Sequence, residues 1–355
     1  TSLPEIKIPD HVKTMGSYCF ALCTSMKKAE VGTGITTIQR STFSNCSSLV
    51  DMKIGKNVAN IAQKTFFACT SLPAITIPQA TTAIKDSVFY NCFNLATLVV
   101  EDRTKNLVFG SNGHSTSANN INETAYPLFS TCKLDSVYIG GPISYNTTKE
   151  YGYSPFYFNP TLRTIVINTD TVPQYLCYEC RKLNTATIGD IAVKIGNWAF
   201  SSCFTLNELY FGKNLKNIGN EAFSDCTGVT KIVSTSEVPA VCGTRALSDM
   251  DEWNCTLYVP ANSLEAYQTA SQWNEFIFTE SIEETYTLTY VVDDEVYATY
   301  KIAEGGEITL PETPVREGYI FSGWSEIPEV MPAENVTITG SFINNTFTVT
   351  YIIDV

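Results

Sequence analysis

Histidine is scarce in this 355-residue sequence, and long apolar runs are missing from it. No stretch of about 18 consecutive apolar residues occurs, so no transmembrane helix is expected. A Ser-His-Asp or Cys-His site would need His11, which lies in a turn-like segment, or His114, which lies in a segment rich in Asn and Ser. The pair Gly32-x-Gly34 lacks the strand–helix context of a phosphate-binding loop. We therefore expect no catalytic residues and no cofactor.

Basic residues are outnumbered, with 23 Lys and Arg against 36 Asp and Glu, and the imbalance is concentrated at one end. Residues 281–355 contain 13 acidic residues but only Lys301 and Arg316 as basic ones, so this segment carries −11 of the net charge of −13. Such a segment repels nucleic acid and anionic membrane surfaces. We expect it to be a solvated spacer that resists aggregation.

A 23-residue repeat dominates the rest of the chain, and three kinds of residue mark it in one register. A phenylalanine precedes most of the repeated cysteines by three positions, and an apolar residue follows most of them by three positions. The repeat cysteines are Cys23, Cys46, Cys69, Cys92, Cys132, Cys180, Cys203 and Cys226. Chance does not keep three residue types in one register over nine or ten copies, so the sequence predicts a stacked repeat fold.

Each copy begins with the alternation of a strand that has one buried face, as in Ile6 and Ile8. A turn, two apolar residues and a Phe-x-x-Cys segment, which we expect to form one helical turn, complete the coil. One coil cannot bury its own apolar side, so the coils must stack, with strands pairing in parallel at about 4.8 Å. The sequence predicts about ten coils over residues 1–279, with insertions at 101–126 and 140–158.

The pattern L-x-x-I-x-I-P-x-x-V-x-x-I-x-x-x-x-F-x-x-C resembles the BspA-type leucine-rich repeat of bacterial surface proteins. Residues 256–279, which include Trp273, are similar to the C-terminal coil and cap of that family. The resemblance implies a leucine-rich-repeat solenoid of parallel strands with short helical or 3-10 turns. A cap is also required physically, because the last coil would otherwise expose an open sheet edge.

Residues 286–345 resemble a second family, the Listeria–Bacteroides repeat, which is related to the internalin B-repeat. The segments that carry this resemblance are Tyr286-Thr-Leu-Thr-Tyr-Val-Val-Asp293 and Gly318-Tyr-Ile-Phe-Ser-Gly-Trp324. It implies a small α+β domain of β-grasp type, with Phe321 and Trp324 as core aromatics and residues 280–285 as a linker. The first strand recurs 61 residues later, so residues 346–355 form either the start of a second copy or a closing strand.

Twelve cysteines raise the question of disulfides or a metal site. Nine of them, the eight repeat cysteines and Cys177 in a phenylalanine position, lie where a small side chain packs inward. Neighbouring sulfur atoms there are too far apart and too parallel to bond. The pair Cys177-x-x-Cys180 imitates a redox or zinc motif, but no second pair or histidine accompanies it. We expect free thiols there and no metal. Cys242 and Cys255 lie outside the ladder, and a disulfide between them remains open.

The 23-residue register breaks twice. The step from Leu95 to Leu134 is 39 residues, which adds 16, and the next step, to Leu162, is 28. Inserted segments of a solenoid project as loops that often carry binding, although tolerated drift of a loop explains them equally well. The insertion residues that we consider as partner contacts are Tyr145, Tyr151 and Tyr153.

The residue that faces outward between the two buried positions of each strand changes in character along the chain. It runs Lys7, Glu30, Lys53, Thr76, Val99, Tyr138, Val166, Thr187, Tyr210 and Val233. A binding surface calls for such an apolar and aromatic row, whereas a solvated sheet face does not. The β-propensity of Val, Thr and Tyr offers another explanation. Our hypothesis is that a partner contacts Val99, Tyr138, Val166, Tyr210 and Val233.

The resemblance implies an adhesin-like scaffold without catalytic activity, secreted or held at a bacterial cell surface. Its partners would be host extracellular-matrix proteins or other microbial surface proteins, and we expect a monomer with no segment inserted in a membrane. The alternative is a glycan-binding surface module, since exposed Tyr beside Asn and Asp suits sugar stacking. Thr1-Ser2-Leu3 falls inside a repeat with no signal peptide before it, as expected if signal and anchor segments are absent.

Overall fold

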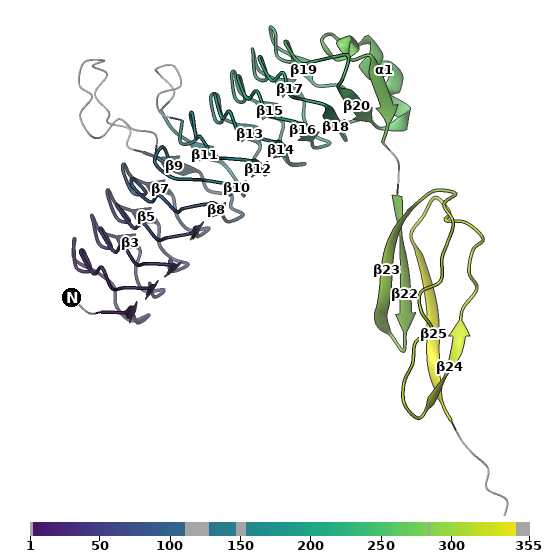
Figure 1. Cartoon of the computed structure of the whole chain (residues 1–355), viewed down its shortest axis with the longest axis horizontal. Coiled ribbons are helices and arrows are strands. Elements are labelled where there is room, and N and C mark those ends of the chain that lie inside the picture. The colour runs from purple at the N-terminus through teal and green to yellow at the C-terminus, as the bar shows by residue number, and fades with distance from the viewer. Residues whose placement is uncertain (1–2, 111–127, 147–153, 283–284, 346–355) are drawn as a thin grey trace, which may run out of the picture. The chain divides into compact units, whose positions relative to one another are not determined.

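The structure, a computed structural model, describes residues 3–110, 128–146, 154–282 and 285–345. It divides into two compact units, Thr1–Ile282 and Glu283–Val355, and each has a hydrophobic core of its own. The first unit is a solenoid of about 11 turns built on parallel strands (Figure 1). This confirms the leucine-rich-repeat fold that the sequence predicts.

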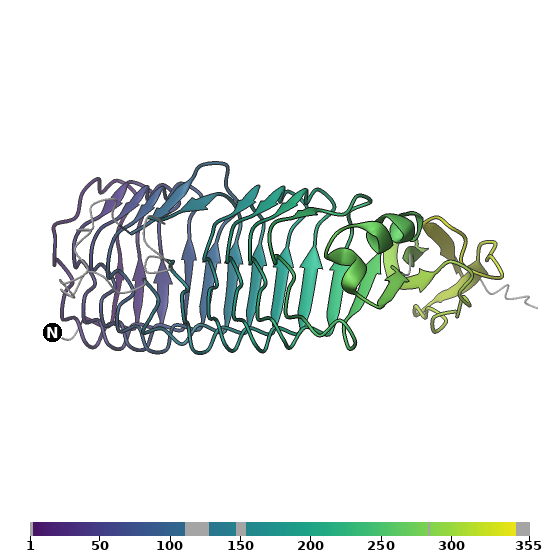
Figure 2. The same cartoon turned by 90° about the horizontal axis from the view of Figure 1, so that it is seen from above.

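One side of the solenoid consists of one strand from each coil, and neighbours in this series pair in parallel. Figure 2 shows these strands side by side along the rod. The first sheet contains β1 (Glu5–Lys7), β2 (Lys28–Glu30) and β4 (Asp51–Lys53). The second contains β6 (Ala74–Ile77), β8 (Thr97–Val100), β10 (Ser136–Ile139), β12 (Thr164–Ile167), β14 (Thr185–Ile188), β16 (Glu208–Phe211), β18 (Lys231–Ser234), β20 (Thr256–Val259) and β21 (Phe278–Ser281).

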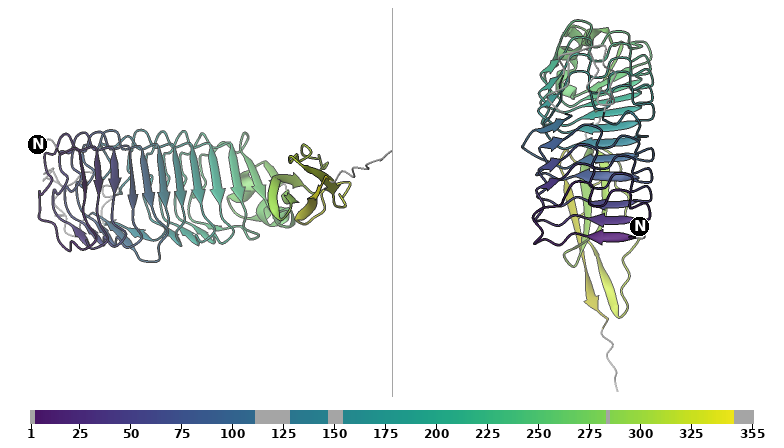
Figure 3. Two further views of the ribbon diagram at one scale, coloured as in Figure 1. Left: turned by 90° about the horizontal axis from the view of Figure 1, so that it is seen from below. Right: turned by 90° about the vertical axis from the view of Figure 1, so that its left-hand side faces the viewer.

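Shorter strands form the opposite side of the solenoid, also in parallel (Figures 1 and 3). Five of them make one sheet: β3 (Thr37–Ile38), β5 (Asn60–Ile61), β7 (Ala83–Ile84), β9 (Leu107–Phe109) and β11 (Ile143–Ser144). Four make another: β13 (Thr171–Val172), β15 (Lys194–Ile195), β17 (Asn217–Ile218) and β19 (Val241–Cys242). The core lies between the two sides, because alternation along each strand sends every second side chain inward.

Two ladders of side chains fill the third side of the core. Phenylalanine rings stack from Phe20 to Phe156 and again from Phe200 to Phe223, with centroids 5.1 to 5.8 Å apart. Cys177 takes the ring position between these two stacks. Beside them, each ladder thiol donates to the carbonyl of the ring residue one coil earlier, as Cys46 does to Phe20 at 3.2 Å. The ladders explain why phenylalanine and cysteine mark the repeat.

One coil replaces the cysteine with a buried asparagine, Asn159, which the cysteine spacing does not reveal. Its side-chain amide donates to the carbonyls of Phe129 and Cys132, both at 3.2 Å. Its oxygen accepts the backbone N–H groups of Thr161 and Leu162 at 3.2 and 3.1 Å. The asparagine therefore continues the ladder and also fixes the start of the next segment.

The Phe-x-x-Cys segment differs in detail from the single helical turn that the sequence predicts. In most coils two residues have positive φ, such as Ser41 and Asn45 before Cys46, and most of these residues are not glycine. Such residues seldom adopt this conformation. Here the backbone N–H groups of Ser41, Phe43 and Asn45 donate to carbonyls of the next coil at 2.7 to 3.1 Å. Equivalent bonds in other coils run in the same direction, and they offset the strain.

A short helical segment closes the C-terminal end of the solenoid, within the residues 256–279 that resemble a cap. It consists of η1 (Ala261–Ser263), α1 (Leu264–Thr269) and η2 (Trp273–Glu275). Trp273 and Tyr267 are fully buried against the last coils, and the Trp273 indole N–H donates to Ala240 at 2.8 Å. The side chain of Gln272 accepts from the Leu247 N–H at 3.0 Å and donates to the Gly243 carbonyl at 2.6 Å. The cap thus bonds the backbone groups that the last coil leaves unpaired.

The second unit is a mixed four-stranded sheet with the order β23-β22-β25-β24. Its strands are β22 (Thr285–Val292), β23 (Glu295–Ala303), β24 (Tyr319–Trp324) and β25 (Val336–Asn344). The central pair, β22 and β25, is parallel, consistent with a β-grasp type, although residues 304–318 contain no helix. Tyr290 is fully buried, while Phe321 and Trp324 are half-buried, with the Trp324 ring 4.9 Å from Tyr290.

Candidate binding surface

The predicted outward row is a continuous line of side chains along the broad sheet. Each member is the direct neighbour of the next in the parallel register. In order they are Thr76, Val99, Tyr138, Val166, Thr187, Tyr210, Val233 and Tyr258. All from Val99 onward are half-buried except Val166, which is 37% exposed. We call these residues the strand-face row.

A second outward row runs parallel to the first, two residues earlier in each strand. It consists of Ala74, Thr97, Ser136, Thr164, Thr185, Glu208, Lys231 and Thr256. Most of its members are small and uncharged, so the rings and branched side chains of the strand-face row stand beside short neighbours. The broad face is consequently low in charge from β6 to β14.

Ion pairs occupy the equivalent positions in the first three coils. Lys7 contacts Glu30 at 3.0 Å, and Lys28 contacts Asp51 at 3.4 Å. Exposed pairs of this kind contribute little to stability. Their effect is to keep the first coils polar, so that the apolar part of the face begins at a defined place, β6.

Hydrogen bonds hold two tyrosines of the strand-face row in place. The Tyr138 hydroxyl donates to the carboxylate of Asp102 at 2.5 Å, and the Tyr210 hydroxyl donates to Glu208 at 2.8 Å. In both cases the bond to the carboxylate is the main reason that the tyrosine pKa is raised above its ordinary value. Both rings are thus oriented before any partner binds, which lowers the entropy lost on binding.

Lys231 joins two aromatic residues of the row across three coils. Its ammonium group lies 5.5 Å from the centre of the Tyr210 ring and 5.9 Å from that of Tyr258, within the range of cation–π attraction. Reasoning from the sequence missed Tyr258, Lys231 and Glu208. The continuation of the alternating pattern into 256–259 would have revealed Tyr258, and the second outward position of β16 and β18 would have revealed the other two.

Tyr145 does not belong to this surface, which corrects its assignment as a partner contact. It is 9% exposed, and its hydroxyl donates to the backbone carbonyl of Gln174 at 2.7 Å. The described start of the second insertion, residues 140–146, thus places the Tyr145 side chain in the core. Tyr151 and Tyr153 lie outside the residues that the structure describes.

The first insertion begins with a buried arginine. The Arg103 guanidinium donates to the carbonyls of Thr81, Ile77 and Pro78, the last two at 3.1 and 2.8 Å. Burial lowers the pKa of Arg103. These bonds fix residues 101–110 to the preceding coil, and residues 111–127 lie outside the described part of the chain.

The cysteines offer no nucleophile that resembles an active site. All twelve are free thiols, including Cys242 and Cys255, which do not bond to each other. Burial raises the pKa of both to about 12, and it raises the pKa of Cys177 well above its ordinary value. Within the described ranges, no cluster of His, Cys, Asp and Glu is arranged to hold a metal ion.

Comparison with known families matches almost the whole chain. The BspA type leucine rich repeat region, in six copies, matches residues 1–117, 111–203, 149–250 and 170–287. The Listeria-Bacteroides repeat domain matches residues 286–346. Both resemblances drawn from the sequence are confirmed.

Individual relatives are more distant. Internalin H of Listeria monocytogenes is 27% identical over 117 residues, a match that covers 29% of this chain and 21% of internalin H. The chain therefore spans about a fifth of the length of that relative.

In the part of this chain that the structure describes, no helix combines the length and apolarity needed to cross a membrane.

Two solved structures are similar to this chain over most of its length. A leucine-rich repeat protein from Bacteroides ovatus is 20% identical, with 79% of this chain and 84% of that chain covered and a TM-score of 0.39. A leucine-rich cell surface protein from Faecalibacterium prausnitzii is 19% identical, with 79% and 80% covered and a TM-score of 0.33.

Proposed function

Because the chain belongs to the BspA-type leucine-rich-repeat family, we propose that its solenoid is a non-catalytic scaffold that binds a protein partner through the strand-face row. The observation that carries this proposal is the register of the broad sheet. It brings Val99, Tyr138, Val166, Tyr210 and Val233, which are spread over 135 positions of the sequence, into one line.

The chemistry of the row supports a protein partner. Tyrosine is enriched in the centre of protein interfaces, because its ring supplies apolar area and its hydroxyl a hydrogen bond. Tyr138 and Tyr210 are already held by Asp102 and Glu208. A flat and preorganised face of this kind suits an extended contact and offers no enclosed space for a reaction.

The family supports a role outside the cell or at its surface. Part of the chain is similar to internalin H, and both matching repeat families, the BspA type and the Listeria-Bacteroides type, support this placement. The acidic second unit suits a solvated spacer between such a surface and the solenoid. We therefore place the protein among secreted or surface-held adhesin-like scaffolds, with an extracellular-matrix or microbial surface protein as partner.

Replacing Tyr138 and Tyr210 with serine tests this proposal. Immobilised extracellular-matrix proteins are exposed to the wild-type chain and to the double variant, and binding is measured by surface plasmon resonance. We expect the double variant to lose about 10-fold or more in affinity, because buried interface tyrosines often contribute about 2 kcal/mol. Its melting temperature should fall by only a few degrees, since both residues are half-buried.

The variant Tyr18→Ser provides the matched control, because Tyr18 is 54% exposed and lies in a turn of the first coil. It should bind like the wild type. Equal binding by the Tyr138/Tyr210 variant and the wild type would show that the strand-face row is not the contact surface.

A further inference from the structure

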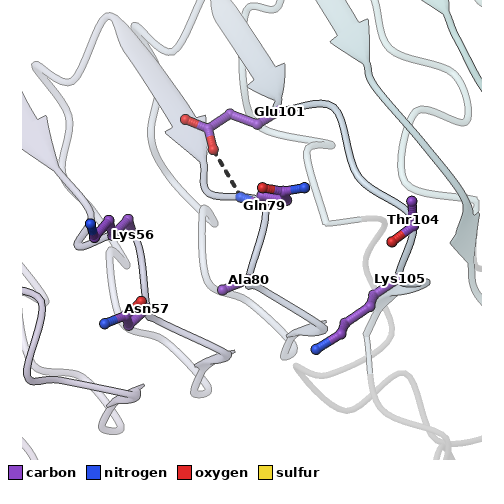
Figure 4. A pocket seen from close by; sticks show the side chains of 7 residues that line it. All are labelled: Lys56, Asn57, Gln79, Ala80, Glu101, Thr104 and Lys105. Atoms are coloured by element: carbon purple, nitrogen blue, oxygen red, sulfur yellow. Dashed lines mark hydrogen bonds between the residues drawn. The ribbon is translucent and has the colours of Figure 1, made fainter.

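An open pocket of about 420 Å³ lies at the corner where the chain leaves strands β4, β6 and β8. Figure 4 shows its lining from close by. The lining residues are Lys56, Asn57, Gln79, Ala80, Glu101, Thr104 and Lys105. None of them belongs to the strand-face row, so the pocket is a separate feature of the solenoid.

The pocket exists because the first insertion makes one corner longer than its neighbours. Lys56 and Gln79 occupy the same position on successive coils, and the chain from Glu101 to Lys105 forms the wall beside them. The Glu101 carboxylate accepts the backbone N–H of Gln79 at 2.9 Å. Buried Arg103 holds the same wall to the preceding coil. The walls are therefore fixed without a ligand.

Two exposed cations line this pocket from different coils. Lys105 extends from one edge toward the coil that carries Ala80, and Lys56 lies at the opposite edge with its nitrogen turned away from Lys105 (Figure 4). Within the described ranges, neither lysine forms an ion pair. The surrounding sequence is also basic, because residues 1–110 contain eleven Lys and Arg against seven Asp and Glu, although the chain as a whole is acidic.

We propose that this pocket binds an anionic saccharide, a sugar that carries a carboxylate or a sulfate group. Lys105 at one edge and Lys56 at the opposite edge supply the positive charge that attracts an anionic group. The Thr104 hydroxyl, the Gln79 side-chain amide and the second carboxylate oxygen of Glu101 supply the donors and acceptors that sugar hydroxyls need. An acidic peptide of Asp and Glu has no hydroxyl groups that could donate to Glu101, and it is repelled by that carboxylate as an anionic sugar is. The volume lies within the range of small-ligand sites.

Calorimetric titration of the full chain tests the assignment with four probes: a sulfated heparin tetrasaccharide, a hyaluronan tetrasaccharide, neutral maltotetraose and a tetraglutamate peptide. We expect the sulfated or the carboxylated sugar to bind, and more weakly at 200 mM than at 50 mM NaCl. Lys56→Gln with Lys105→Gln should weaken that binding about 10-fold, since each exposed charge pair contributes up to about 1 kcal/mol.

The variant with Lys182→Gln and Lys194→Gln removes the same charge from two exposed positions elsewhere and should bind like the wild type. Binding of either acidic sugar that depends on Lys56 and Lys105 supports the proposal and identifies the anionic group. Equal binding of maltotetraose, stronger binding of the peptide, or equal losses in both double variants would each overturn it. The strand-face experiment is unaffected by any of these outcomes.

Discussion

Asn159 shows how a single side chain can hold a repeat together where the repeat's own residue is missing. The ladder cysteines each make one weak bond to a carbonyl, whereas Asn159 donates to two carbonyls and accepts from two backbone N–H groups. All of these groups are buried or partly buried. Their bonds cannot be replaced by water without rearranging the coil.

We predict that Asn159→Ala lowers the free energy of unfolding of the solenoid by about 2–4 kcal/mol, because it leaves several buried polar groups unpaired. Urea denaturation followed by circular dichroism measures the loss. Cys203→Ala, which removes only one thiol bond at 3.1 Å, is the comparison and should cost about 1 kcal/mol. Equal losses in the two variants would contradict the role assigned to the asparagine.

The burial of Tyr145 and the ladder position of Asn159 could not be predicted from the sequence. The repeat places a residue reliably when its type recurs, as for the phenylalanines and cysteines. Tyr145 lies in an insertion with no counterpart in other coils, so nothing in its spacing indicates that its ring faces inward. Asn159 fills a cysteine position with a different kind of donor, which a search for cysteine cannot find.

The Phe-x-x-Cys turn of each coil is the element that the sequence predicts least well. Its left-handed positions are occupied by residues as different as Tyr18, Lys64 and Trp198, so no glycine signals them. The conformation is set by the hydrogen bonds to the next coil, which are a property of the stack. The local sequence favours a helical turn, but the hydrogen bonds between stacked coils impose the observed conformation.

The cap is the element in which these turn bonds end. Gln272 is half-buried, and its side chain bonds to Leu247 and Gly243 in the last coil. We predict that Gln272→Ala destabilises the solenoid by about 1–3 kcal/mol, because one acceptor and one donor are lost together. Hydrogen exchange should show faster exchange of the Leu247 amide.

The variant Gln272→Glu separates the two bonds, because it keeps the acceptor for Leu247 and loses the donor to Gly243. The Leu247 amide should remain protected in this variant. Fast exchange of that amide in both variants, or in neither, would show that the cap does not act through this bond.

The whole chain contains two cores of very different size. The solenoid core extends from the first coils to the cap, whereas in the described part of the second unit the buried core cluster consists of Leu288, Tyr290, Met331 and Ile338. A core of four residues supports only marginal stability. The division into two regions could be predicted because the repeat pattern stops and a different alternation begins. The small size of the second core could not be predicted, because Phe321 and Trp324, which are half-buried, look like core residues in the sequence.

We predict that calorimetry of the full chain shows two transitions, with the second unit unfolding at the lower temperature. The fragment 1–282 should keep the upper transition within a few degrees and lack the lower one. A single transition in the full chain that moves when residues 283–355 are removed would mean that the units unfold together.

The backbone hydrogen bonds of the Phe-x-x-Cys turns to the next coil all point in one direction, so the peptide dipoles of these turns align. Each peptide unit carries a dipole of about 3.5 D, and aligned dipoles add, as they do in a helix. The N–H groups of Ser41, Phe43 and Asn45 and their equivalents point toward the C-terminal end. The positive ends of these dipoles therefore point toward the cap along the turn side of the solenoid, whereas backbone N–H groups on the other sides, such as those of Ala62 and Gly212, donate to the preceding coil and oppose them.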